Sequence, residues 1–176
     1  MRAAALVSIL VFLATSAAAA TNPYRGMEAR AIKALPEQEI ADLRAGKGMS
    51  MALAAELNGH PGPRHVIDLA QPLGLTPEQA AAVQSLFGAM QGEAAALGEA
   101  VVDGEAELEQ RFRSASLDED DLRARVMAIA ELRGRLRATH LRYHLATRAV
   151  LDRHQLLLYD RLRGYGDSNR PHGHRH

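Results

Sequence analysis

A strong helix-start signal lies in the stretch Leu75-Thr76-Pro77-Glu78-Gln79. A threonine side chain can cap the free backbone N–H groups of a first helical turn, and proline is favoured at the position that follows. The glutamine three residues after the threonine completes a capping box, and the leucine before it supplies a hydrophobic staple. The stretch therefore predicts that a long helix begins at the proline.

An apolar stripe at helical spacing follows this start. Its members recur in steps of three, four or seven over about nine turns, as expected for one buried face of a long helix. They are Val83, Phe87, Met90, Ala94, Leu97, Val101, Leu108 and Phe112. The pattern breaks at residues 114–116, after which a second stripe begins. Its members are Leu122, Val126, Ile129, Leu136 and Thr147. Two long helices joined by a short loop are expected to pack antiparallel.

A second helix-start signal comes after this second stripe and reads Leu151-Asp152-Arg153-His154-Gln155. Aspartate caps a helix as threonine does, and the glutamine again closes a capping box behind a leucine staple. A short C-terminal helix is therefore expected, ending near the arginine at position 163.

Shorter helices are expected before the hairpin, separated by turns rich in glycine and proline. Their predicted ranges are 36–44, 50–57 and 64–73. The predicted fold is all-α: a long antiparallel helical hairpin with short N-terminal helices and a short C-terminal helix. The predicted divisions are a signal peptide at 1–20, an N-terminal lead with short helices at 21–63, the hairpin domain at 64–164 and a disordered, histidine-rich tail at 165–176.

The N-terminal segment has the pattern of a secretory signal peptide. A short positive start is followed by an apolar run that is too short to span a membrane, and small residues before Ala20 suit signal-peptide cleavage. The chain has no cysteine, which excludes both a lipoprotein anchor and disulfide bonds. These features predict a periplasmic protein.

The composition narrows the class of function. The chain carries 21 Lys and Arg against 21 Asp and Glu, a balance that argues against nucleic acid as a partner. It has no tryptophan and many alanines, as expected for long helices around a thin core. No nucleophile–base arrangement and no phosphate-binding loop is recognisable, so we expect no enzymatic activity and no catalytic residue.

The two start signals that flank the hairpin resemble the paired LTxxQ motifs of the Spy/CpxP superfamily. That superfamily includes the CnrX-like and ZraP-like periplasmic heavy-metal sensor and resistance proteins. The resemblance covers roughly residues 57–165, and Asp152 stands where the motif has threonine. It implies a periplasmic helical hairpin that acts as an ATP-independent chaperone, as an inhibitor of an envelope-stress sensor, or as a metal sensor or buffer.

Two histidines stand at a spacing that suits a metal ion. At about 100° per residue, His140 and His144 share the apolar face of the second long helix, and two imidazoles at i and i+4 can bind one ion. On the partner helix they are expected opposite Gly92 and Gly88, which would leave space for the rings, with Glu93 nearby. The alternative is structural, with both imidazoles bonded to carboxylates or carbonyls at the helix seam.

The resemblance implies further ligands near the start of the chain, where His65 is the main candidate and His60 or Glu56 a weaker one. At the end of the chain, alternate histidines can bind zinc, copper or nickel weakly or can simply be solvated. The predicted ligands of a zinc, copper or nickel ion are thus His65, His140 and His144, more weakly Glu93 and His60, and in the tail His172, His174 and His176. No organic cofactor is expected.

Other residues allow two interpretations each. Met49 and Met51 could bind copper through their soft thioethers, although methionines more often fill gaps in a core. The second long helix is rich in arginine, which could hold unfolded chains or form solvated i, i+4 ion pairs. These arginines are Arg123, Arg125, Arg133, Arg135, Arg137, Arg142 and Arg148.

Two functions follow from these patterns. The first is a periplasmic envelope-stress or heavy-metal resistance protein that binds a transition-metal ion through histidines, as a sensor or a buffer. The second is an ATP-independent chaperone or an inhibitory adaptor of an envelope-stress sensor, with structural histidines. The expected partners are a second copy of the chain, because a thin hairpin exposes much apolar area, and unfolded clients or a membrane sensor.

Overall fold

The structure is a computed structural model that describes residues 22–165, and this part of the chain is helical without strands. The helices are η1 (Met27–Ala29), α1 (Glu37–Arg44), α2 (Leu53–Glu56), α3 (Pro63–Asp68), α4 (Pro77–Arg113), α5 (Glu119–Val150) and α6 (Arg153–Leu162). The all-α prediction is confirmed. The expected signal peptide and the tail histidines His172, His174 and His176 lie outside the described residues.

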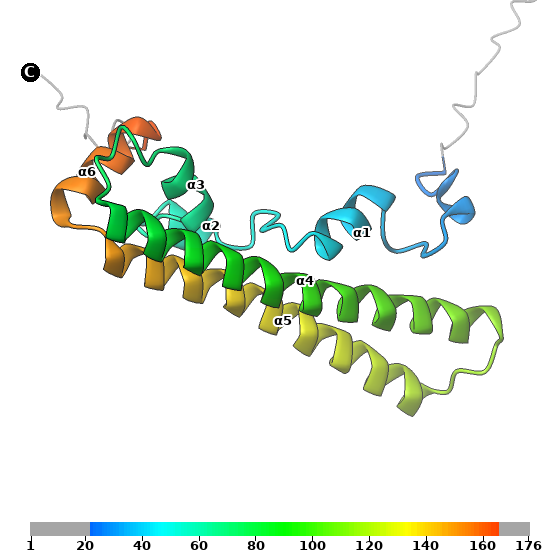
Figure 1. The fold of residues 1–176 in the computed structure, drawn as a ribbon. Helices are drawn as coiled ribbons and strands as arrows, with labels where there is room; N and C mark the ends of the chain where they lie inside the picture. The colour runs from blue at the N-terminus through cyan, green and yellow to red at the C-terminus, as the bar shows by residue number, and fades with distance from the viewer. Residues whose placement is uncertain (1–21, 166–176) are drawn as a thin grey trace, which may run out of the picture.

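Helices α4 and α5 pack antiparallel and form the hairpin (Figure 1). Both helix N-termini that the motifs predict are capped. The Thr76 hydroxyl accepts the backbone N–H of Gln79 at 3.2 Å, and the Gln79 side chain accepts the N–H of Thr76 at 3.1 Å. Asp152 and Gln155 make the same reciprocal pair at the start of α6, at 2.8 and 3.0 Å.

The two motif glutamines also bond to each other. The amide of Gln79 donates to the carbonyl oxygen of the Gln155 side chain at 2.9 Å, and the Gln155 amide donates back at 2.9 Å. Gln79 donates in addition to the backbone carbonyl of Val150 at the end of α5. Gln155 is buried and Gln79 partly buried, and polar groups in such places are usually hydrogen-bonded. These bonds join the start of α4 to the end of α5 and to α6.

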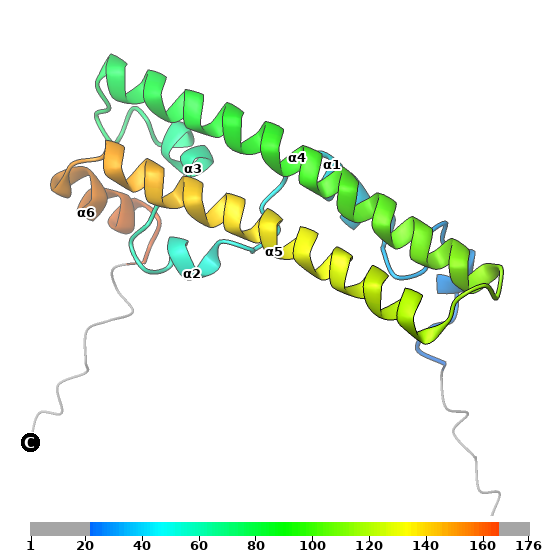
Figure 2. The ribbon, with the colours of Figure 1, turned by 90° about the horizontal axis from the view of Figure 1, so that it is seen from below.

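The short helices lie on one side of the hairpin, as the two perpendicular views show (Figures 1 and 2). Helix α1 packs on the middle of α4, while α2, α3 and α6 gather where α4 begins and α5 ends. We call that end the base and the end with the connecting loop, residues 114–118, the tip. No helix among the described residues is long and apolar enough to cross a membrane.

Two of the short helices are shorter than their patterns predicted. Helix α3 ends at Asp68 and turns continue to Gly74, because Pro72 has no N–H to donate and disfavours helix in the residue before it. Helix α2 begins at Leu53 because Ser50, where we expected it to start, has a left-handed backbone with φ 67°.

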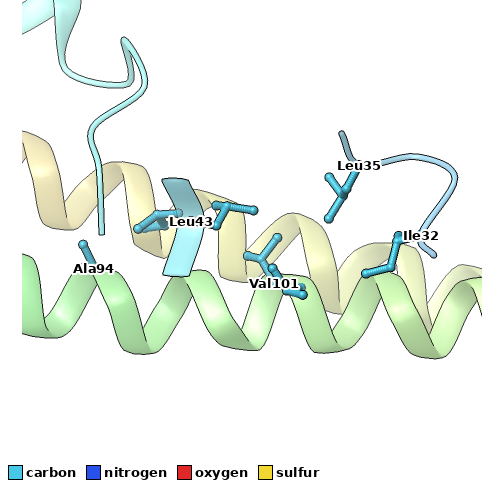
Figure 3. Close-up of a cluster of buried hydrophobic side chains, with 7 residues drawn as sticks. Ile32, Leu35, Leu43, Ala94 and Val101 are labelled. Carbon is cyan, nitrogen blue, oxygen red and sulfur yellow. The ribbon is translucent and has the colours of Figure 1, made fainter. Parts of the chain in front are cut away.

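Two apolar clusters form the core. The first lies between α1, α4 and α5, where Ile32, Leu35 and Leu43 face Ala94 and Val101 (Figure 3). The second cluster, at the base, contains Val66, Leu73, Val83, Leu151 and Tyr159. Helix α1 approaches α4 so closely that a Cβ atom at Gly98 would lie 2.0 Å from the Leu43 carbonyl oxygen. Only glycine fits at this crossing.

The predicted apolar stripes are not buried at the tip. Phe112 is 61% exposed and Val126 is 46% exposed. The two helices diverge toward their loop (Figure 1), and ion pairs bridge them there instead, with Arg125 bonded to Glu107 at 2.9 Å. The expectation that both residues belong to the buried seam is therefore wrong, because the helices separate before they reach it.

Candidate metal site

A cavity of about 560 Å³, partly open to solvent, lies on the side of the hairpin that the short helices cover. It is bordered by the loop between α1 and α2, by α2 and α3, and by the facing sides of α4 and α5. Its polar lining includes His65 from α3 with His140 and His144 from α5, so three predicted ligands border one space. Glu56 from α2 borders it as well.

Glu56 is the most heavily bonded side chain of the site. It is 3% exposed and accepts the backbone N–H of Gly62 and His65 Nδ1, each at 3.0 Å. Its other partners are the hydroxyls of Tyr159 and of Tyr165. Burial would raise the pKa of this carboxyl group, but the bonds from His65, Tyr159 and Gly62 outweigh burial and lower the pKa to about 2. Glu56 is thus a charged carboxylate whose acceptor sites are largely occupied.

This carboxylate sets the tautomer of one histidine, and a backbone carbonyl sets that of another. A carboxylate and a carbonyl can only accept, so His65 Nδ1–H donates to Glu56 and His144 Nδ1–H donates to the His60 carbonyl at 2.7 Å. In a neutral ring the remaining lone pair is then on Nε2. Metal-binding histidines are oriented in this way, with the second nitrogen bonded to a carboxylate or carbonyl.

His140 differs from both. It is 2% exposed, and its Nε2 atom is buried without a hydrogen-bond partner. Burial, with a contribution from His144, lowers the pKa of this imidazole, which favours the neutral ring. A buried nitrogen without a partner is costly unless something bonds to it. His140 therefore has an unpartnered ring nitrogen, and the residue borders the cavity.

Glycines make room for these rings, but not the ones that the sequence predicted. Gly88 and Gly92 are exposed, and a Cβ atom at either would meet nothing within 4 Å, so the expected packing against the histidines is wrong. A Cβ atom at Gly62 would lie 2.9 Å from His144 Nε2, and one at Gly48 would lie 3.8 Å from His140 Nδ1. The spacing argument failed because the buried face of α4, where Met90 is 8% exposed, lies about half a turn away from these glycines.

The weaker candidates lie elsewhere. Glu93 is held by Arg142 and by the hydroxyl of Tyr143, and it borders a groove on α4 and α5 separate from the cavity. The ring of His60 bonds to the Asn58 carbonyl at 2.9 Å, and only its backbone oxygen reaches His144. Within residues 22–165, no three His, Cys, Asp or Glu side chains are placed so that they could hold a metal ion.

The site residues that the sequence did not predict come from the C-terminal part of the chain. Tyr159 and Tyr165 reach Glu56 across 103 and 109 residues of sequence. The period of α6 predicts only that one face is buried, and a tyrosine on it is equally consistent with simple packing. Met90 was predicted as a core residue and does lie in the interior, where it also lines the cavity.

Imidazole and carboxylate groups are of the types that bind metal ions, although no three of them among the described residues converge on one point. The model of the heavy-metal resistance family matches residues 48–156, more than half of the chain. The matched range contains the whole hairpin and all the cavity-lining histidines. No curated protein and no solved structure matches the chain. The chain therefore belongs to the heavy-metal resistance family, which is related to the Spy/CpxP-like periplasmic proteins that it resembles in sequence.

Proposed function

We propose that this protein binds a transition-metal ion in the cavity between α3 and α5, as a metal sensor or buffer of the periplasm and without catalysing a reaction. The ligands would be His65, His140 and His144. Membership of a heavy-metal resistance family supports the metal, and the family is typically periplasmic. The observation that carries the proposal is the buried, unpartnered Nε2 atom of His140, in a cavity that is also lined by two histidines whose Nδ1 atoms are already bonded.

Glu56 has a supporting part in this proposal. Its acceptor sites are occupied by Tyr159, Tyr165, Gly62 and His65. It is therefore better suited to orient His65, and to balance charge nearby, than to bind the ion itself. Because the three imidazoles do not converge in the structure, binding requires a shift of side chains or an additional donor.

The test is calorimetric titration with Zn²⁺, Ni²⁺ and Cu²⁺. The background is the full chain with His172, His174 and His176 replaced by alanine, so that the tail cannot bind. A dissociation constant below about 1 µM is expected for at least one ion, which corresponds to about −8 kcal/mol. The double change His140→Ala/His144→Ala should weaken that binding by at least ten-fold, on the order of what loss of even a supporting residue costs.

His154→Ala is the matched control, because His154 is exposed on α6 and does not border the cavity. It should leave the affinity unchanged. Gly62→Ala is a second probe of the same space, since its methyl group would approach His144 Nε2, and we expect it to weaken binding. If no ion binds, or if the double variant binds as well as its parent, the histidines are structural and the proposal is wrong.

A chaperone or adaptor function is the second candidate, and the exposed apolar side chains of the tip favour it. Phe112 and Met127 are 61% and 64% exposed. A second copy of the chain is the partner we propose for such surfaces, and a monomeric mass in solution scattering would exclude a homodimer. Suppression of client aggregation without metal, lost on replacing Phe112 and Met127 by serine, would support the chaperone.

A further inference from the structure

The position of Met90 raises a question about which ion the cavity takes. Met90 is 8% exposed and lines the cavity together with His140. Within the described residues it belongs to neither of the two apolar clusters, unlike Val83 before it and Ala94 after it on the same face of α4. Its thioether is therefore a buried sulfur at the border of the cavity that His140 also lines.

A second thioether reaches the cavity from the loop between α1 and α2. Met49 borders the cavity and has a left-handed backbone with φ 39°, and Ser50 follows with φ 67°. Residues with side chains rarely adopt this conformation, and adjacent strained residues are commonly found at binding sites. Met49 and Met51 both pack against the first apolar cluster and border a neighbouring groove, but only Met49 also lines the cavity.

The nitrogen and oxygen donors do not converge on one point in the structure. No three His, Cys, Asp or Glu side chains among residues 22–165 are placed to bind one. Ions such as Zn²⁺ need about four donors, whereas soft ions such as Cu⁺ are selected by sulfur ligands and accept low coordination numbers. One imidazole and two thioethers are a donor set of the second kind.

The charges around the cavity also favour an ion of low charge. The carboxylate of Glu56 is occupied by its hydrogen bonds, and the histidines are neutral ligands. The exposed cations Lys47 and Arg64 stand at its border. The cost of burying an ion rises steeply with its charge, so a singly charged ion is held here at lower cost than a doubly charged one.

We propose that Met90 and Met49, together with His140, make this cavity a site for a soft, singly charged ion, Cu⁺ or its analogue Ag⁺. The proposal rests on the proposed function, that the cavity binds a metal ion, and adds the class of ion and two thioether ligands. It assigns the strained loop a purpose, which is to keep Met49 at the border of the cavity that His140 lines.

The experiment uses Ag⁺, which has the ligand preference of Cu⁺ and does not change oxidation state, in chloride-free buffer. The protein is the full chain with the three tail histidines replaced by alanine. Ag⁺ and Zn²⁺ affinities are measured for this parent and for Met90→Leu, Met49→Leu and the double variant. Leucine has nearly the volume of methionine, so the fold is expected to persist, and circular dichroism checks it.

Ag⁺ should bind more tightly than Zn²⁺, and each single variant should weaken Ag⁺ binding by at least about ten-fold while Zn²⁺ binding stays within about two-fold. Met127→Leu is the matched control, because Met127 is an exposed thioether on α5, and it should change neither affinity. In spectra of methionines labelled with ¹³C at the methyl group, one equivalent of Ag⁺ should shift the signals that are missing from Met90→Leu and Met49→Leu.

The outcomes separate the two proposals. Histidine-dependent binding of Zn²⁺, Ni²⁺ or Cu²⁺, with Ag⁺ binding insensitive to both leucine variants, would overturn the thioether site and leave the proposed function standing. Loss of Ag⁺ affinity in Met127→Leu equal to that in Met90→Leu would show adventitious binding to surface thioethers and would also overturn it. Absence of any histidine-dependent ion binding would overturn both proposals.

Discussion

The base and the tip of one hairpin are stabilised in opposite ways. At the base, polar side chains such as Glu56 and Gln155 are buried among the short helices and make several hydrogen bonds each. At the tip, apolar side chains such as Phe112 are exposed, and the helices are bridged by surface ion pairs. The same pair of helices thus has a buried polar interior at one end and an open apolar surface at the other.

This difference indicates where the function lies. Buried charged groups often stabilise a protein no more than well-packed apolar groups of the same volume would, so their presence in an interior points to another role. The base keeps a charged carboxylate and an unpartnered imidazole in its interior, while the tip has neither. We therefore expect changes at the base to have large effects and comparable changes at the tip to have small ones.

The largest effect is expected from Glu56→Ala. It leaves the donors of Tyr159, Tyr165, Gly62 and His65 without their acceptor, and breaking a buried charged network commonly costs about 3–5 kcal/mol. The free energy of unfolding, measured with urea, should fall by this amount.

Glu107→Ala is the counterpart at the tip. Glu107 pairs with Arg125 but is 71% exposed, and exposed ion pairs contribute at most about 1 kcal/mol. Glu56→Gln, which keeps one carbonyl acceptor, should fall between the two. Equal losses in Glu56→Ala and Glu107→Ala would show that the base network contributes no more than a surface pair.

The second-largest effect is expected in the free energy of unfolding at acid pH, measured with a chelator present so that no metal contributes. The pKa of Glu56 is lowered from 4.5 to about 2 in the folded protein. Between these two pH values the unfolded chain binds more protons than the folded protein. The stabilisation that charged Glu56 contributes is therefore complete above pH 4.5 and is lost as the pH falls toward 2. The difference corresponds to on the order of 3 kcal/mol.

Glu56→Gln removes the titrating group and should flatten this part of the profile of unfolding free energy against pH. Its loss of stability relative to the parent should shrink as the pH falls from 4.5. A difference between parent and variant that stays constant from pH 7 to pH 3 would contradict the assignment of the lowered pKa to Glu56.

The sequence predicted the hairpin well because its signals are local. The capping boxes at Thr76 and Asp152 each depend on residues within three positions, and the structure contains both. The i, i+4 spacing likewise predicted that His140 and His144 share one buried face, and both are buried. Local rules hold here because helix caps and helix periodicity are properties of the backbone itself.

The rest of the site could not be predicted from local sequence rules. Which residues of α4 face α5 depends on the rotation of one helix against the other, and a pairing count from the loop placed Gly88 and Gly92 there wrongly. The convergence of Tyr159 and Tyr165 on Glu56 depends on how α6 folds back. The exposure of Phe112 depends on the divergence of the helices, which the continuous stripe gives no sign of.

Gly98→Ala should have an intermediate effect, since Gly98 lies between base and tip. A methyl group there would lie 2.0 Å from the Leu43 carbonyl oxygen, so α1 must move away from α4. Forcing extra volume into a packed contact typically costs about 1–3 kcal/mol.

Gly134→Ala on α5 is the matched control, because a Cβ atom there meets nothing within 4 Å. It should stabilise the helix by up to about 1 kcal/mol. If both variants shift the urea midpoint in the same direction, α1 does not pack as closely as the structure indicates.

The smallest effect is expected from Phe112→Ser at the tip. Replacing a buried phenylalanine by a small residue commonly costs about 3–5 kcal/mol, but Phe112 is 61% exposed, and exposed sites usually change stability by less than about 0.5 kcal/mol. Leu136→Ala, in a stripe residue that is 2% exposed, is the contrasting variant and should cost about 2–5 kcal/mol.

A large loss in Phe112→Ser that depends on protein concentration would mean that a second copy covers the tip. A large loss independent of concentration would instead mean that the tip is packed like the base, and the contrast between the two ends would not hold.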